Sequence, residues 1–294
     1  MPKTLTHMFA PKFDIERLRP YALHVAVAVG LLAALILLWP SPPSASFVSR
    51  WRSPAPMTQP EPQVAPGVEP APIDGSAFAA SDFDVQVADG LYAGERVQLR
   101  SELDMALAYV VGRFGSGPHA RFTATIVDDE GCGLHGIAYT DVRDVQVYSC
   151  GSIGRDRAVA IMAHEFVHQL AQDRYGAAHL HADMILLEGV ATWGAGKYWL
   201  GGQPDFRSYV RAQRRAGALL PLATNYNGLG VAAMNTLYYQ WASFVEFLVQ
   251  TYGREKFDQL YVTGASEPGS SNYAGVYGKP LDVLEQEWLA WLDS

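Results

Sequence analysis

Cysteine is scarce in this chain: only two of its 294 residues are cysteine, Cys132 and Cys150. Neither belongs to a Cys-x-x-Cys pair, so a thiolate zinc site is not expected. If this part of the chain lies outside the cytoplasm, the two residues can form a disulfide. By the loop-entropy model, that bond stabilises the fold by about 3 kcal/mol. In a reducing compartment they stay free thiols.

Positive charge is also in short supply. Lys and Arg together number 22 against 30 Asp and Glu, and the net charge is -8. A protein that binds nucleic acid needs a basic face, so we expect no nucleic-acid partner. In the second half of the chain the basic residues cluster only at Arg211, Arg214 and Arg215. We expect these three to form the solvated face of one helix. Nothing in the sequence indicates an oligomeric state.

The sequence contains one long apolar run, residues 21–39, which only His24 interrupts. As a helix it spans roughly 28 Å, close to the thickness of the hydrocarbon core of a bilayer. Tyr21 and Trp39 bracket the run, as aromatic residues do at membrane interfaces. The basic segment 1–20 predicts a cytoplasmic N-terminus. We therefore expect a single-pass transmembrane helix that anchors the protein in the membrane.

A cleaved secretory signal peptide is the alternative interpretation of this run. The small residues at positions 43–46 would then be the cleavage site, and the protein would be secreted. The apolar part of a signal peptide is usually shorter than this run, so we favour the anchor. Both interpretations place the rest of the chain outside the cytoplasm. Residues 40–74 are rich in Pro and predict a semi-rigid linker, and residues 75–294 form the folded domain.

Hydrophobic periodicity in this domain predicts mainly strands first and helices afterwards. Alternating β-branched residues indicate short strands, and apolar residues three and four apart indicate helices. We expect an α+β fold, with a small mixed sheet followed by a mostly helical lobe. The predicted strands are 121–127, 136–140 and 144–149; the predicted helices are 95–114, 158–171, 181–199, 204–219, 232–252, 256–262 and 281–292; the predicted long loops are 221–230 and 264–278.

One helix, residues 158–171, carries the run His164-Glu165-Phe166-Val167-His168. Residues four apart lie one turn apart on the same helical face, so His164 and His168 can offer two imidazole nitrogens to one metal ion. Glu165 lies about 100° round the helix, where it suits a general base better than a third ligand. The alternative is a pair of partly buried histidines on an amphipathic helix.

A catalytic zinc site usually needs a third protein ligand. The extended pattern H-E-x-x-H-x-x-G-x-x-H fails here, because Ala171 and Arg174 occupy its last two defined positions. Glu188 is the best candidate, since a carboxylate within an apolar helix is costly to bury without a charged partner. Gly189 and Ala191 are small, and we expect them to let this helix approach the first one. The rival candidates are Asp173, His179, His181 and Asp183.

The two histidines and the glutamate, followed by Glu188-Gly189-x-Ala191, resemble the motifs of gluzincin (thermolysin-like) metallopeptidases. The chain is most similar to the peptidase MA-like domains of bacterial exported proteins. The later segments 238–248 and 252–256 are similar to the C-terminal helix of that family, and the resemblance covers roughly residues 121–260.

The resemblance implies a function for several residues. His164, His168 and Glu188 would bind Zn²⁺, and Glu165 would act as the base. Tyr238 matches a tyrosine that stands near the reacting carbonyl, with Tyr239 as its neighbour; the alternative is that both tyrosines belong to the core. Strand 144–149 matches the edge strand that pairs with an extended peptide substrate.

Together these expectations describe a membrane-anchored, extracytoplasmic zinc metallopeptidase that acts on a peptide or protein substrate. Two alternatives stay open. The chain can be a catalytically silent, membrane-tethered binding domain that keeps its metal site, although the intact Glu165 argues against this. It can also hydrolyse a non-peptide amide, because the zinc chemistry is shared.

Overall fold

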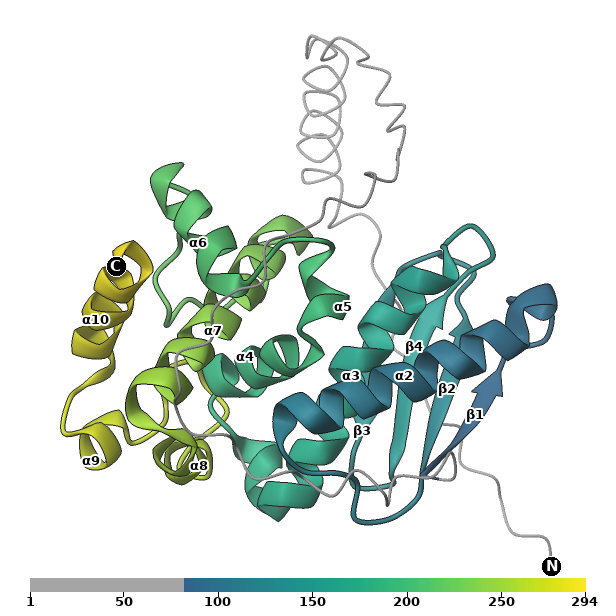
Figure 1. Ribbon diagram of the computed structural model, residues 1–294, viewed down its shortest axis with the longest axis horizontal. Coiled ribbons are helices and arrows are strands. Elements are labelled where there is room, and N and C mark those ends of the chain that lie inside the picture. Colours follow the sequence, from purple (N-terminus) through teal and green to yellow (C-terminus); the bar gives the residue numbers. More distant parts are fainter. Residues whose placement is uncertain (1–81) are drawn as a thin grey trace, which may run out of the picture. The chain divides into compact units, whose positions relative to one another are not determined.

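The computed structural model describes residues 82–294 of this chain (Figure 1). The predicted cytoplasmic segment 1–20, the predicted transmembrane helix 21–39, the predicted linker 40–74 and the start of the domain at residue 75 lie outside the described residues. Among the helices of residues 82–294, none combines the length and the apolar character needed to cross a bilayer.

The sheet has four strands in the order β1-β2-β4-β3. β1 pairs with β2, and β2 with β4, in parallel, whereas β3 and β4 form an antiparallel pair. The expected mixed sheet is therefore confirmed, and the three predicted strands agree with the structure to within one residue. The strand at Phe83–Val87 was not predicted. The strands are β1 (Phe83–Val87), β2 (Phe122–Asp128), β3 (His135–Tyr139) and β4 (Asp144–Ser149).

The strand order corrects one expectation. Residues 144–149 were expected to be an edge strand, but β4 lies inside the sheet between β2 and β3. Its main-chain groups bond to neighbours on both sides, so β4 has none left for a peptide. The antiparallel hairpin places β3 outside β4 instead. At this end of the described sheet, the edge strand is therefore β3.

Helices α2 (Arg96–Phe114) and α3 (Arg155–Tyr175) cover one face of the sheet (Figure 1). Aromatic packing fixes α3 there: the Phe166 ring lies 5.3 Å from the Phe83 ring and 5.5 Å from the Phe122 ring, measured between centroids. All three side chains are buried. This contact anchors the middle of α3 to the sheet, two residues from each histidine of the motif.

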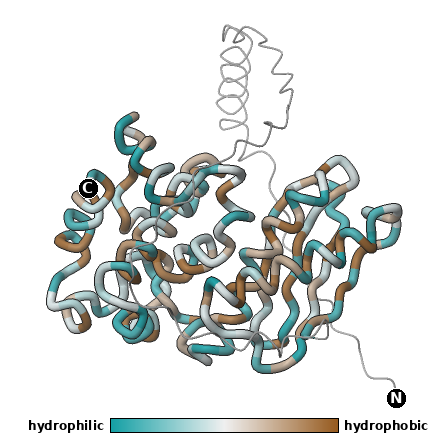
Figure 2. Tube along the Cα trace, viewed as in Figure 1, coloured by the Kyte–Doolittle hydropathy of each residue, from teal (hydrophilic) through white to brown (hydrophobic). Residues whose placement is uncertain are grey.

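The remaining helices form the second lobe, so the α+β plan is confirmed at the level of the fold. One continuous core joins the lobe to the sheet, and Figure 2 shows apolar residues along the strands and along the packed sides of the helices. The elements are the 3-10 turns η2 (Ala93–Glu95) and η3 (Gly176–His181) and the helices α4 (Met184–Ala195), α5 (Lys197–Leu200), α6 (Phe206–Arg215), α7 (Val231–Tyr252), α8 (Arg254–Tyr261), α9 (Tyr273–Tyr277) and α10 (Leu281–Asp293).

The helix predicted at 181–199 is broken in two places. Asp183 caps the start of α4 by accepting a hydrogen bond from the Ile185 amide. Gly196 ends α4 with φ at 49°, and a Cβ there would lie 2.3 Å from the Tyr109 hydroxyl. A glycine is required at this position, because no side chain fits and the backbone lies in the left-handed region.

Asp183 also binds the segment predicted as the loop 264–278. Its carboxylate is fully buried and accepts hydrogen bonds from the amides of Gly269 and Ser271 and from the Tyr273 hydroxyl, all at 2.9–3.0 Å. This segment, which contains α9, is therefore docked against the start of α4.

The arginines of α6 do not simply form a solvated face. Arg211 donates to the carbonyl of Leu292, and Arg214 donates to the carbonyl of Leu289, at the end of α10. Positive charge there complements the negative end of the helix dipole. The interpretation as a solvated face is therefore wrong for these two residues, whereas Arg215 is exposed.

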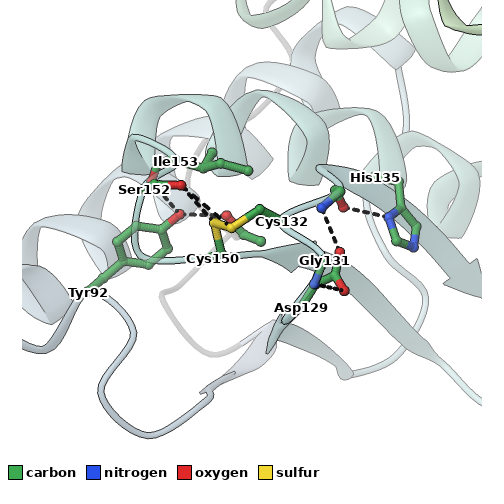
Figure 3. The surroundings of a disulfide bond; sticks show 10 residues. Tyr92, Asp129, Gly131, Cys132, His135, Cys150, Ser152 and Ile153 are labelled. Atoms are coloured by element: carbon green, nitrogen blue, oxygen red, sulfur yellow. Dashed lines mark hydrogen bonds between the residues drawn. A yellow bond between two sulfur atoms is a disulfide. The ribbon is translucent and has the colours of Figure 1, made fainter. Parts of the chain in front are cut away.

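Cys132 and Cys150 form a disulfide, with their Cα atoms 5.1 Å apart (Figure 3). The bond joins the loop before β3 to the residue after β4. In the same loop, the Asp129 carboxylate accepts hydrogen bonds from the amides of Gly131 and Gly133. The disulfide therefore holds the hairpin immediately before α3.

Candidate metal centre

His164 and His168 lie on the face of α3 that points away from the sheet. Their side chains are buried, at 4% and 8% residue exposure, and their Nε2 atoms are 3.2 Å apart. This proximity follows from the four-residue spacing, because one helical turn separates the two side chains. Phe166, on the opposite side of the helix, holds this face in place.

Glu188 on α4 completes a group of three. Its Oε2 atom lies 3.2 Å from Nε2 of His164 and 3.8 Å from Nε2 of His168. The three ligand atoms all lie within 4.8 Å of one another. Two imidazole nitrogens and one carboxylate oxygen are a donor set typical of catalytic zinc sites. The residues therefore fit a zinc ion.

Two glycines let α4 pack closely on both sides. A Cβ on Gly194 would lie 2.7 Å from Cγ2 of Val167 on α3, and a Cβ on Gly189 would lie 2.8 Å from the main-chain oxygen of Trp241 on α7. Gly189 was expected to face α3, but it faces α7. Gly194 is the glycine that brings α4 against α3.

The protonation states of this group also suit a metal ion. Burial lowers the pKa of His168 to about 3. The negative charge of Glu188 raises this pKa, whereas His164 and His179 lower it further. Burial raises the pKa of Glu188, but its hydrogen bond to His164 and the charges of the two histidines outweigh burial, so the pKa lies below its usual value. A neutral imidazole and an ionised carboxylate are the forms that bind metal.

Glu165 has a buried but unpaired carboxylate. Its residue exposure is 5%, yet within residues 82–294 the carboxylate makes no hydrogen bond. Neither carboxylate oxygen is fully buried, so both are accessible to solvent. Burial raises the pKa of Glu165 to about 7. His164 lowers this pKa, and the charge of Glu188 raises it. A carboxylate with this pKa can take up and release a proton near neutral pH.

Gly136 on β3 makes room for Glu165. A Cβ at this position would lie 2.2 Å from Oε1 of Glu165 and 2.6 Å from its Cδ. The edge strand and the glutamate are thus in direct contact. The sequence alone does not reveal this contact, because nothing local links residue 136 to residue 165.

Aromatic rings line the group beside His164. The Tyr238 ring is parallel to the His164 ring at 5.7 Å, and the Trp199 ring lies 4.8 Å from it. Tyr238 also interacts with Glu188 and helps to lower the pKa of that carboxylate. Tyr239 points elsewhere: its hydroxyl donates to the carbonyl of Trp199 at 2.9 Å. Of the two tyrosines, only Tyr238 is therefore placed at this group.

The rival ligand candidates lie outside the group of three. Asp173 forms an ion pair with Arg143 at 2.5 Å, Asp183 is committed to the start of α4, and His181 is exposed. His179 is buried with its ring 5.7 Å from the His168 ring, and its Nδ1 is hydrogen-bonded outside the group.

Sequence reasoning missed Thr192 and Trp199. The Thr192 hydroxyl lies 3.4 Å from Nδ1 of His164, on the side of the ring away from Glu188. Thr192 follows Glu188 by four residues, so helical spacing was a usable signal for it. Trp199 gave no such signal, because α5 starts only after the turn at Gly196.

No family model and no curated protein matches this chain. Among solved structures, it is similar to the M1 zinc metallopeptidase from Deinococcus radiodurans, with 19% sequence identity and a TM-score of 0.43. A mutant of that enzyme matches with 21% sequence identity and a TM-score of 0.44. A two-domain mutant form bound to L-arginine matches with 21% identity and a TM-score of 0.43. Each match covers 71% of this chain and 48% of the other, so this chain spans about half the length of those proteins. The geometry of the site itself must therefore carry the assignment of function.

Proposed function

We propose that this chain is a zinc-dependent peptidase, anchored in the membrane by residues 21–39, with its catalytic domain outside the cytoplasm. One observation carries the enzymatic part of the proposal. Two histidines and a glutamate from separate helices converge within 4.8 Å, and the carboxylate of Glu165 stands unpaired beside them.

His164, His168 and Glu188 would hold the zinc ion. When bound there, zinc would supply a polarised water molecule whose pKa lies well below that of bulk water. The Thr192 hydroxyl beside Nδ1 of His164 helps to orient that ring, as partners of ligating histidines do.

Glu165 is the proton carrier. Its carboxylate has no competing hydrogen bond in the described part of the chain, so it is free to accept a proton from a water molecule at the site. It then returns that proton to the leaving amine of the substrate. A group that takes up and returns a proton works best when its pKa is close to the working pH, and burial raises the pKa of Glu165 in that direction.

Tyr238 and β3 supply contacts to the substrate. The Tyr238 hydroxyl, next to Glu188, is placed to donate a hydrogen bond to the oxygen of the reacting carbonyl. β3 is the edge strand beside Glu165, and its free main-chain groups can pair with an extended peptide. A peptide is therefore the substrate class that we favour.

The cellular location rests on the N-terminal sequence. The apolar run and its basic flank favour an anchor with the N-terminus in the cytoplasm. The disulfide between Cys132 and Cys150 supports an oxidising compartment for the domain.

The test combines metal content with peptide cleavage. We expect about one zinc per chain in the wild type and in Glu165→Gln, and a loss of zinc in Glu188→Ala. On a peptide library, Glu165→Gln should lower kcat by about 10²- to 10⁴-fold. Wild-type protein without zinc after reconstitution would refute the proposal. Zinc binding with no cleavage of any peptide would favour the tethered binding domain.

A further inference from the structure

His179 lies at the wall of the proposed metal centre without belonging to it. It is part of η3, the turn that connects the two helices bearing the candidate ligands. Its ring centroid is 5.7 Å from that of His168, and its residue exposure is 4%. His179 is not part of the group of three ligand atoms. The proposed peptidase chemistry leaves this buried imidazole without a function.

A tyrosine fixes the tautomer of His179. The Tyr261 hydroxyl lies 2.9 Å from Nδ1 of His179, and within residues 82–294 it has no other hydrogen-bond partner. Tyr261 is fully buried, so its hydroxyl proton must be donated to this nitrogen. Nδ1 is then the acceptor, and the ring proton of a neutral imidazole is on Nε2.

The tyrosine itself is held from the far side. Its ring stacks on the Tyr175 ring with 4.2 Å between the centroids. The Tyr175 hydroxyl in turn donates to Asp258 at 2.5 Å. Tyr261 therefore has little freedom to move, and the direction of the His179 ring is set by packing before any ligand arrives.

The Nε2–H group of His179 is left open. Nε2 has no hydrogen-bond partner in the described part of the chain. This nitrogen is not fully buried, so it is accessible to solvent. A neutral N–H donor on a fixed ring beside His168 is ready for an acceptor that enters from solution.

We propose that Nε2–H of His179 donates a hydrogen bond to a main-chain carbonyl oxygen of the bound peptide, with Tyr261 as the positioning residue. The inference rests on the proposed peptidase function. A neutral donor matches a neutral carbonyl acceptor, and an extended peptide offers one at every residue. The contact belongs to substrate binding, so it sets affinity more than the rate of the chemical step.

The test measures peptide binding in protein that cannot cleave. The zinc-loaded Glu165→Gln variant is titrated with a fluorescently labelled peptide that the wild type cleaves, alone and combined with His179→Phe, His179→Gln or Tyr261→Phe. Phe keeps the ring but removes both nitrogens, whereas the Gln amide restores an N–H near Nε2. His181→Phe, at the exposed end of η3, is the matched control.

We expect His179→Phe to raise the Kd about tenfold, which is the weight of one neutral hydrogen bond. His179→Gln should recover most of that loss, Tyr261→Phe should raise the Kd severalfold, and the control should leave it unchanged. Zinc content should stay at the wild-type level in every variant. With Glu165 restored, His179→Phe should raise KM and leave kcat nearly unchanged.

Two results would overturn the inference while leaving the peptidase proposal intact. The first is an unchanged Kd in His179→Phe. The second is a loss of zinc in His179→Phe, which would make the residue part of the metal site. If His179→Phe does not fold, the peptide affinities of His179→Gln and Tyr261→Phe test the inference instead. Equal losses of affinity in these two variants would indicate a purely structural role. Wild-type protein that binds no zinc would instead refute the peptidase proposal on which the inference rests.

Discussion

The position of Glu165 depends on a missing side chain. The carboxylate occupies the space next to Gly136, where any Cβ would be 2.2 Å from Oε1. A methyl group at this position would therefore force the Glu165 side chain to move. The base of the proposed reaction is therefore positioned by a residue on the edge strand, not by its own helix alone.

We expect Gly136→Ala to displace Glu165 and to lower kcat by about 10²- to 10⁴-fold, the range for loss of a general base. Zinc content should be retained, because the three atoms nearest to a Cβ at Gly136 all belong to Glu165 and none to a candidate ligand. Steady-state kinetics and metal analysis on the same preparation would check this. Gly112→Ala on α2 is the matched control, since a Cβ there meets no atom within 4 Å. Full activity in Gly136→Ala would contradict the expectation.

At the scale of elements, α3 is held at its C-terminal end by one carboxylate on α8. Asp258 accepts hydrogen bonds from Tyr175 at 2.5 Å and from Arg254 at 2.7 Å, and it pairs with Arg174. Burial raises the pKa of Asp258, but the hydrogen bonds from Arg174, Arg254 and Tyr175 outweigh burial, and the pKa lies below the usual value. The ionised carboxylate thus ties α8 to the helix that bears both histidines.

A lowered pKa in the native state has a defined consequence for stability. The contribution of Asp258 is complete above the pKa of the unfolded chain, about 3.9, and is lost as the pH falls from there through the native pKa. We expect Asp258→Asn to reduce the free energy of unfolding by about 1–3 kcal/mol at pH 7. The difference from the wild type should shrink as the pH falls below about 4.

Urea denaturation at several pH values would measure this difference. Glu255→Gln is a suitable control, because this exposed carboxylate on the same helix forms no ion pair in the described part of the chain. It should follow the wild-type profile. A difference between Asp258→Asn and the wild type that does not change with pH would show that the ionised carboxylate is not the source of the stability.

At the scale of the whole molecule, the disulfide is the one covalent link between distant parts of the described chain. It closes the loop that contains β3 and β4. We expect replacement of Cys132 and Cys150 by Ser to lower the free energy of unfolding by about 3 kcal/mol, by the loop-entropy model. Denaturant unfolding of the double variant would measure it. Zinc content should not change, since the candidate ligands lie on α3 and α4.

The chain has no other cysteine, so a disulfide exchange cannot complicate this experiment. Reduction of the disulfide in the wild type should lower the free energy of unfolding by the same amount as the double substitution. An unfolding free energy that is unaffected by either treatment would contradict the prediction, and it would also weaken the support for an oxidising compartment.

The predictions that agreed best with the structure depend on local periodicity. The helix that carries His164 and His168, and the closeness of their Nε2 atoms, follow from the 3.6-residue repeat. The strand Asp144–Ser149 was predicted to the residue, because alternation is a local signal. The break of the helix predicted at 181–199 was missed, because Gly196 ends α4 at a position where its neighbour is Tyr109 of α2.

The positions of elements relative to one another needed the tertiary structure. Nothing local places β3 at the edge and β4 inside the sheet, because strand order depends on pairing between segments far apart in the chain. The same holds for Gly189, which faces α7 and not α3, and for the arginines of α6, whose partners lie at the end of α10.

The sequence by itself determined the types of most elements, the spacing of His164 and His168 and the donor chemistry that favours zinc. These features depend on residues within a few positions of one another, where the backbone repeat sets the geometry. Only the tertiary structure decided that Glu188 lies against both histidines, that Gly136 makes room for Glu165 and that Tyr261 fixes the ring of His179. Those contacts join separate elements, and only the packing of one common core brings them within bonding distance.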